Sequence, residues 1–186
     1  MALVVNLLGG PGSGKTVLGI DLFSKFKKQT NIKTELVSEY AKEITYQENG
    51  MALADQMLIT STHHHRLFML NKKVELIITD SSLLNSSVYM EYSKYPNVSK
   101  IANDAATSLY KLYKNINIFV PRINKPYQNF GRQQSELDAK ILDDKFKDLY
   151  LKSKEDAFLN IDLSENTDKE QDVSYIFNII KKNIEQ

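Results

Sequence analysis

The chain has 186 residues, of which 42% are hydrophobic and 25% charged, a balance typical of a globular protein with a normal core. A formal net charge of +1 at pH 7 excludes a whole-chain electrostatic attraction to nucleic acid or membranes, although it leaves a local basic patch open. There is no cysteine, which excludes disulfides and thiolate chemistry, and there is no apolar run of membrane-spanning length. We expect one domain over residues 1–186, a cytoplasmic location and no membrane partner.

A strand, a glycine-rich loop and a helix are predicted at the start of the chain. Leu3–Leu8 is an apolar run of strand length, and residues 17–28 carry apolar side chains at helical spacing. Between them, Gly9–Thr16 fits the phosphate-binding pattern G-x-x-x-x-G-K-[ST] at every fixed position. The backbone N–H groups of such a loop surround a polyphosphate, and the helix N-terminus adds partial positive charge. The residues that we expect to bind ATP are Gly10, Pro11, Gly12, Ser13, Gly14, Lys15 and Thr16.

Strand and helix patterns alternate along the rest of the chain, which favours a parallel sheet with helices on both faces. Further strands are predicted at Thr34–Ser38, Glu75–Thr79, Ile116–Val120 and Ala157–Ile161. Helices are predicted at residues 51–71, 82–95, 99–113, 135–152 and 172–184. Residues 121–134 are polar and contain the breakers Pro121, Pro126 and Gly131. A loop of this length in a compact α/β domain is often a lid, so we expect a lid at about 121–134.

Asp80 ends the apolar strand run Ile77–Thr79 in a carboxylate. In phosphate-loop proteins an acid at this point helps to hold Mg²⁺. We therefore expect Thr16 and Asp80 to hold the metal and Lys15 to reach the β- and γ-phosphates. The alternative is a solvated Asp80 that caps the helix beginning near Ser82.

Glu39 follows the second predicted strand. Ligands of parallel sheets bind at the carboxyl ends of the strands, so Glu39 is expected to enter the same cleft as Lys15. A carboxylate there could accept the proton of an attacking hydroxyl, and Asp80 could do the same. The alternative for Glu39 is a helix-start acid that complements the helix dipole, and Glu43, one turn further on, is expected at the surface.

Arg122, Lys125 and Arg132 flank the candidate lid. Arginine from a mobile segment can neutralise the charge that phosphoryl transfer spreads over the equatorial oxygens. We expect Arg122 and Arg132 to be catalytic, with Gly131 as a hinge, against the alternative of a solvated basic loop.

The run His63-His64-His65 does not predict a metal site, because consecutive helical residues point about 100° apart. Gln56 could hydrogen-bond a base. Arg66 could contact an acceptor phosphate, although a surface role is the simpler interpretation.

The chain resembles the small P-loop nucleoside and nucleotide kinases over nearly its whole length, most closely the ribosylnicotinamide-kinase-like branch and bacteriophage kinases of that type. The stretches that carry the resemblance are Gly9–Thr16, Ser38–Ala41, Gln56, Ile78–Asp80 and Pro126–Arg132. The resemblance implies a P-loop NTPase three-layer sandwich with a five-stranded parallel sheet in the order 2-3-1-4-5. It also implies a Mg·ATP donor, a lid between strand 4 and the next helix, and residues 164–166 near the adenine.

The chain departs from this family at the acceptor motif. Ser81 and Ser82 follow Asp80 where an arginine would favour a monophosphate acceptor, and there is no Asp-Arg-Tyr-type motif. Nucleosides, nucleoside-like cofactor precursors and modified bases within DNA remain as acceptors.

The sequence thus favours a Mg²⁺- and ATP-dependent kinase acting on a hydroxyl of a nucleoside- or nucleotide-type acceptor. One alternative is a phage-type kinase that phosphorylates a hydroxymethylated pyrimidine, such as 5-hydroxymethyluracil, in DNA, as some thymidylate-kinase-like relatives do. A third candidate, from another class, is an ATPase that acts as a nucleotide-driven switch on a partner protein. A homodimer is compatible with the sequence, which leaves the oligomeric state open.

Overall fold

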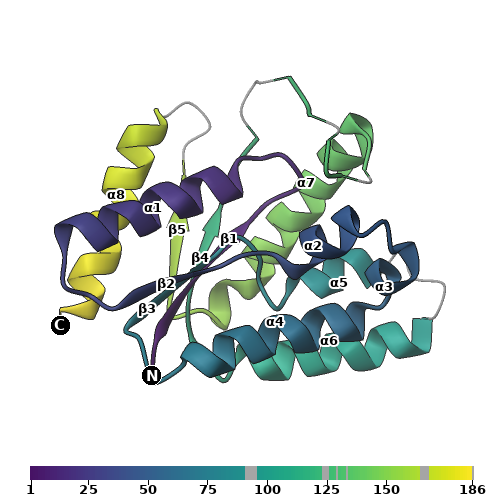
Figure 1. Ribbon diagram of the computed structural model, residues 1–186, viewed down its shortest axis with the longest axis horizontal. Helices are drawn as coiled ribbons and strands as arrows, with labels where there is room; N and C mark the ends of the chain where they lie inside the picture. The colour runs from purple at the N-terminus through teal and green to yellow at the C-terminus, as the bar shows by residue number, and fades with distance from the viewer. Residues whose placement is uncertain (91–95, 123–125, 129, 133, 164–167, 186) are drawn as a thin grey trace.

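A five-stranded parallel sheet lies between two layers of helices (Figure 1). The computed structural model describes residues 1–90, 96–122, 126–128, 130–132, 134–163 and 168–185. The strands are β1 (Leu3–Leu8), β2 (Thr34–Val37), β3 (Leu76–Thr79), β4 (Lys114–Phe119) and β5 (Leu159–Asp162). They pair in the order β2-β3-β1-β4-β5, and every pairing is parallel. The predicted strand order 2-3-1-4-5 is confirmed.

Helices cover both faces of the sheet (Figure 1). The helices are α1 (Lys15–Gln29), α2 (Tyr40–Tyr46), α3 (Gly50–Ala54), α4 (Gln56–Leu70), α5 (Asn85–Met90), α6 (Pro96–Tyr110), α7 (Glu136–Lys152) and α8 (Lys169–Ile184), with a short 3₁₀ turn at Ser153–Glu155. One face is covered by α1 and α8, and the other by α4 to α7. No helix in the described part of the chain is long and apolar enough to cross a membrane.

Successive strand residues point to opposite faces of the sheet, which divides the core in two. Val5 of β1 packs in the core beneath α1 and α8, where the rings of Phe26 and Phe177 lie 4.6 Å apart between centroids. Val4 packs in the core on the other face, together with Leu67 of α4. Because helices cover both faces of the sheet at β1, Leu3–Leu8 is a continuous apolar run with the single polar residue Asn6.

The carboxyl ends of the strands lie along one edge of the sheet, since all five strands run in the same direction. The register aligns Asn6 of β1 with Thr79 of β3 and with Asn117 of β4. Four groups that follow strands therefore lie at the same edge: the phosphate-binding loop after β1, Glu39 after β2, Asp80 after β3 and Arg122 after β4.

Two predicted helices differ from the observed ones. The helix predicted over residues 51–71 is interrupted at Asp55, whose carboxylate accepts hydrogen bonds from the backbone N–H groups of Met57 and Leu58 and so begins α4. The helix predicted over residues 82–95 begins at Asn85, and its predicted end at 91–95 lies outside the described residues. The remaining predicted elements are present, with ends shifted by a few residues.

Candidate active site

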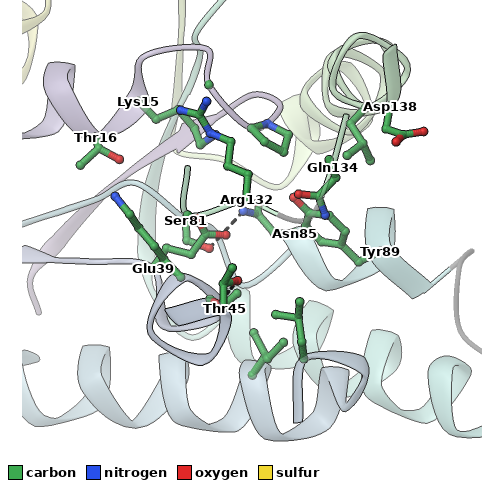
Figure 2. Close-up of a pocket in the computed structure, with 18 of the residues that line it drawn as sticks. Lys15, Thr16, Glu39, Thr45, Ser81, Asn85, Tyr89, Arg132, Gln134 and Asp138 are labelled. Atoms are coloured by element: carbon green, nitrogen blue, oxygen red, sulfur yellow. Dashed lines mark hydrogen bonds between the residues drawn. The ribbon is translucent and has the colours of Figure 1, made fainter. Parts of the chain in front are cut away.

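A cleft of about 1570 Å³ opens at the carboxyl edge of the sheet. Small-molecule pockets commonly measure roughly 300–1,000 Å³, so this cleft has room for two ligands side by side. In the view of Figure 2, Lys15, Thr16 and Glu39 lie on one side of the cleft and Asn85 and Tyr89 on the other.

The glycine-rich loop forms a cradle at one end of this cleft. Gly12 and Gly14 have φ angles of +81° and +101°, in the left-handed region that glycine adopts without strain. Lys15 is buried, and its Nζ donates hydrogen bonds to the carbonyl oxygens of Gly9 (2.7 Å) and Gly10 (2.9 Å). Burial lowers the pKa of Lys15, while the negative charges of Glu39, Asp80 and Asp143 oppose this shift.

Thr16 and Asp80, the predicted metal pair, are in contact. The Thr16 hydroxyl donates to Asp80 Oδ2 at 2.6 Å, and the Glu39 backbone N–H donates to Asp80 Oδ1 at 2.8 Å. Because the hydroxyl hydrogen is directed to Asp80, the lone pairs of Thr16 Oγ1 remain available to a cation. Mg²⁺ prefers such oxygen ligands, one or two from the protein and the others from water and phosphate. This donor set fits Mg²⁺ at the predicted position.

Glu39 lies in the cleft with its carboxylate partly withdrawn from water. Desolvation raises the pKa of Glu39, and the neighbouring charge of Asp80 raises it further, whereas Lys15 and Lys42 lower it. A carboxylate with a raised pKa is a stronger base than a solvated one, so Glu39 is suited to accept a proton.

The two predicted arginines meet over the glycine-rich loop. A Cβ at Gly12 would lie 3.2 Å from Arg132 Cζ and 3.3 Å from Arg122 Nη1, so both guanidinium groups approach the loop closely. The ring of Tyr127 lies near both guanidinium groups, with its centroid 4.9 Å from Arg132 Cζ and 5.8 Å from Arg122 Cζ. Arg132 also donates to the Gln128 carbonyl. The predicted lid thus carries two cations to the place where a phosphate would lie.

A carboxylate of α7 holds Arg122 against the loop. Arg122 Nε lies 2.5 Å from Asp143 Oδ2, and Arg122 Nη2 donates to the Pro11 carbonyl at 2.8 Å. Asp143 Oδ1 in turn accepts a hydrogen bond from Gly10 N at 3.0 Å. This ion pair therefore fixes the first turn of the loop as well as the arginine.

Residues 4–160 match the family described as an AAA domain. The chain belongs to the AAA domain family. No curated protein matches the sequence.

Solved structures share the fold at low sequence identity. The structure of deoxyadenosine kinase from M. mycoides, with products dCMP and a flexible dCDP bound, has a TM-score of 0.65 at 15% identity and covers 96% of this chain and 99% of its own. The crystal structure of APE1195 has a TM-score of 0.53 at 18% identity and covers 98% of this chain and 97% of its own. These likenesses confirm the predicted P-loop NTPase fold.

The three consecutive histidines of α4 have different environments. His63 is buried, the Nδ1 atom of His64 lies 3.0 Å from Tyr113 Oη, and His65 is exposed. Gln56 lines the cleft and donates to the Leu53 carbonyl at 3.1 Å, whereas Arg66 pairs with Glu43 at 2.9 Å. Lys125 and residues 164–166 lie outside the described residues.

Sequence reasoning missed several residues at the site. Asp143 belongs to no motif, and its role depends on α7 packing beside a loop that lies 133 residues earlier. Thr60 and Asn85 each lie in a polar run of a helical segment, and only the packing of α4 beside α5 brings them to the cleft. Tyr127 belongs to the predicted lid, but the sequence does not indicate that its ring lies near both arginines.

Proposed function

We propose that this protein is an ATP- and Mg²⁺-dependent kinase that transfers the γ-phosphate to a hydroxyl of a nucleoside- or nucleotide-type acceptor. The observation that carries the proposal is the position of Glu39. This carboxylate shares one cleft with the phosphate-binding loop, and its raised pKa suits it to remove a proton from a second substrate. Deoxyadenosine kinase, which has the same fold, shows that the fold can serve a nucleoside kinase.

In the proposed reaction the acceptor oxygen forms a bond to the γ-phosphorus, the bond from that phosphorus to the β–γ bridging oxygen breaks, and ADP leaves. Glu39 takes the hydroxyl proton. Asp80 is the less suited base, because both of its oxygens already accept hydrogen bonds, one from Thr16 and one from the Glu39 amide.

The remaining residues bind and orient. The loop amides and Lys15 bind the phosphates. To do so, Lys15 gives up its hydrogen bonds to the Gly9 and Gly10 carbonyls and donates to phosphate oxygens instead. Thr16 and Asp80 would hold Mg²⁺, which would supply positive charge to offset that of the phosphates. Arg122 and Arg132 neutralise charge on the transferred group, and the lid at about 121–134 keeps water from the reaction.

The test is an ATP-consumption assay with and without a panel of nucleosides, mononucleotides and hydroxymethylated duplex DNA, with mass spectrometry of the product. We expect one class of acceptor to stimulate consumption strongly and to gain a phosphate. Hydrolysis at the same rate without any acceptor would instead indicate the nucleotide-driven switch. A phosphorylated base in the DNA arm would identify a DNA kinase.

A matched pair of variants assigns the base. Glu39→Gln removes the proposed base while keeping its size, and Glu43→Gln makes the same change one turn along α2, at an exposed residue paired with Arg66. We expect turnover to fall only in Glu39→Gln. A turnover number within a few-fold of the wild type in that variant would remove Glu39 from the mechanism.

A further inference from the structure

Three buried polar side chains that line the cleft have hydrogen-bonding atoms without a partner among the described residues. They are Thr60, through Oγ1, His63, through both ring nitrogens, and Asn85, through Oδ1. Their exposed fractions are 3%, 3% and 6%. Leaving a buried polar atom unpaired is unfavourable, so four such atoms at one cleft point to a ligand that pairs with them.

These side chains form one surface, which we call the polar wall and define as Thr60, His63, Ser81 and Asn85. Thr60 and His63 lie three residues apart on α4 and therefore on the same face of that helix. Asn85 Nδ2 donates to Ser81 Oγ at 3.0 Å (Figure 2). The Ser81 backbone lies near enough to the His63 ring to raise its pKa, although the two do not meet hydrogen-bond geometry. The polar wall thus joins α4 to the segment that follows β3.

The polar wall carries no formal charge. Burial lowers the pKa of His63 to about 4, with a further contribution from the charge of Arg66, so the ring is neutral near pH 7. Among the described residues that line the cleft, the cations are Lys15, Lys42, Arg122 and Arg132, and none of them comes from α4 or from residues 81–89. A phosphate placed against the polar wall would lose its hydration without gaining a charged partner, which is unfavourable.

We propose that the polar wall binds the uncharged, hydrogen-bonding heterocycle of the acceptor, which makes the acceptor a nucleoside rather than a nucleotide. Thr60 and neutral His63 can each donate and accept, and the Asn85 amide oxygen needs a donor. A base with both N–H donors and ring or carbonyl acceptors satisfies this set. The inference rests on the proposed kinase function, because it identifies the second substrate of that cleft.

The test is binding measured by calorimetry, which does not require turnover. The eight common nucleosides and deoxynucleosides, their 5′-monophosphates and a short single-stranded DNA are titrated into the wild type with a non-hydrolysable ATP analogue present. The same titrations use Thr60→Val, Thr60→Ser and Ser61→Ala. Ser61 is the matched control, since its exposed hydroxyl donates to the Met57 carbonyl of its own helix.

We expect at least one nucleoside to bind more tightly than its 5′-monophosphate and than the DNA. Thr60→Val should raise the dissociation constant roughly 5- to 10-fold, the loss expected for one hydrogen bond, while Thr60→Ser restores it and Ser61→Ala leaves it unchanged. Thr60→Val should also keep or raise the melting temperature, because it removes an unpaired buried hydroxyl. A hydroxyl with only a structural role would show the opposite pattern, with lower stability and unchanged binding.

The inference and the proposed function fail separately. The proposed role of the polar wall would be overturned if monophosphates or DNA bound as tightly as nucleosides. It would also be overturned if Thr60→Val left the nucleoside affinity unchanged. Both results would count even if the protein phosphorylates an acceptor. The absence of binding by any of the nucleosides would also overturn this role. Nucleoside binding that depends on Thr60 but leads to no phosphorylated product would support the polar wall and overturn the kinase.

Discussion

Acidification should destabilise this protein through His63. The folded ring has a pKa of about 4 against 6.5 in a solvated histidine, because it is buried and because Arg66 and His64 disfavour a further positive charge, while Asp80 partly opposes them. Between these two values the unfolded chain binds more protons than the folded one. The free energy of unfolding therefore falls as the pH falls from about 6.5 towards 4.

The size of this effect follows from the two pKa values. A difference of one pKa unit corresponds to about 1.36 kcal/mol, so the complete shift corresponds to about 3 kcal/mol. Between pH 7 and pH 5 the unfolded ring takes up most of a proton and the folded ring little of one, which gives about 2 kcal/mol. This is a large part of the stability of an ordinary domain.

Urea unfolding at the two pH values measures the loss. The wild type should lose about 2 kcal/mol more of its unfolding free energy than His63→Phe, which has no group to protonate. His63→Gln gives the same comparison if phenylalanine does not fit. His65→Gln, a change at an exposed ring on the same helix, should retain the wild-type loss. An equal loss in the wild type and in both His63 variants would refute the reasoning.

Three further predictions concern the loop and the proposed base. The kcat/KM of the wild type should fall with acidity through a pKa above the ordinary 4.5 of glutamate, because burial raises the pKa of Glu39. Glu39→Gln should lose ~10²–10⁴-fold in kcat, and its kcat/KM should show no such fall with acidity. A pH profile of both proteins measures the two effects. Gly12→Ala should lose about 1–2 kcal/mol of unfolding free energy and bind ATP more weakly, since its φ is +81° and its Cβ would crowd two arginines; unchanged melts and ATP titrations would contradict this. Asp143→Ala should cost about 1.5–3 kcal/mol in urea unfolding and weaken ATP binding, because it releases both Arg122 and the Gly10 amide; an ATP affinity equal to the wild type would show that the ion pair does not order the loop.

The parts of the site that follow strands could be predicted from the sequence. The loop motif identifies the first strand–helix unit, and in a parallel sheet every residue after a strand reaches the same edge. Thr16 and Asp80 are 64 positions apart, yet the loop motif and this rule together predict that both lie near one metal ion, and in the structure the two side chains are in contact. The same rule predicts that Glu39 enters this cleft, which Glu39 lines in the structure.

The parts that depend on helix packing could not be predicted. The apolar spacing over residues 51–71 favours one continuous helix, but Asp55 supplies a helix cap that competes with it locally. The unpaired state of Thr60 and Asn85 depends on which atoms of α4 and α5 face each other, and no periodicity contains that information. Asp143 likewise becomes part of the site only through the packing of α7.

Asp80 helps to set the distance between the phosphate-binding loop and Glu39. The strand β3 lies between β1, which carries the phosphate-binding loop, and β2, which leads to Glu39. One carboxylate at the end of this middle strand reaches both neighbours, through Thr16 on one side and the Glu39 amide on the other. Adjacent strands lie about 4.8 Å apart, so the two loops stand about two such steps from each other. The strand spacing therefore sets the distance between the loop that would bind the donor and the carboxylate that would face the acceptor. Asp80 holds both of them at that distance through its hydrogen bonds.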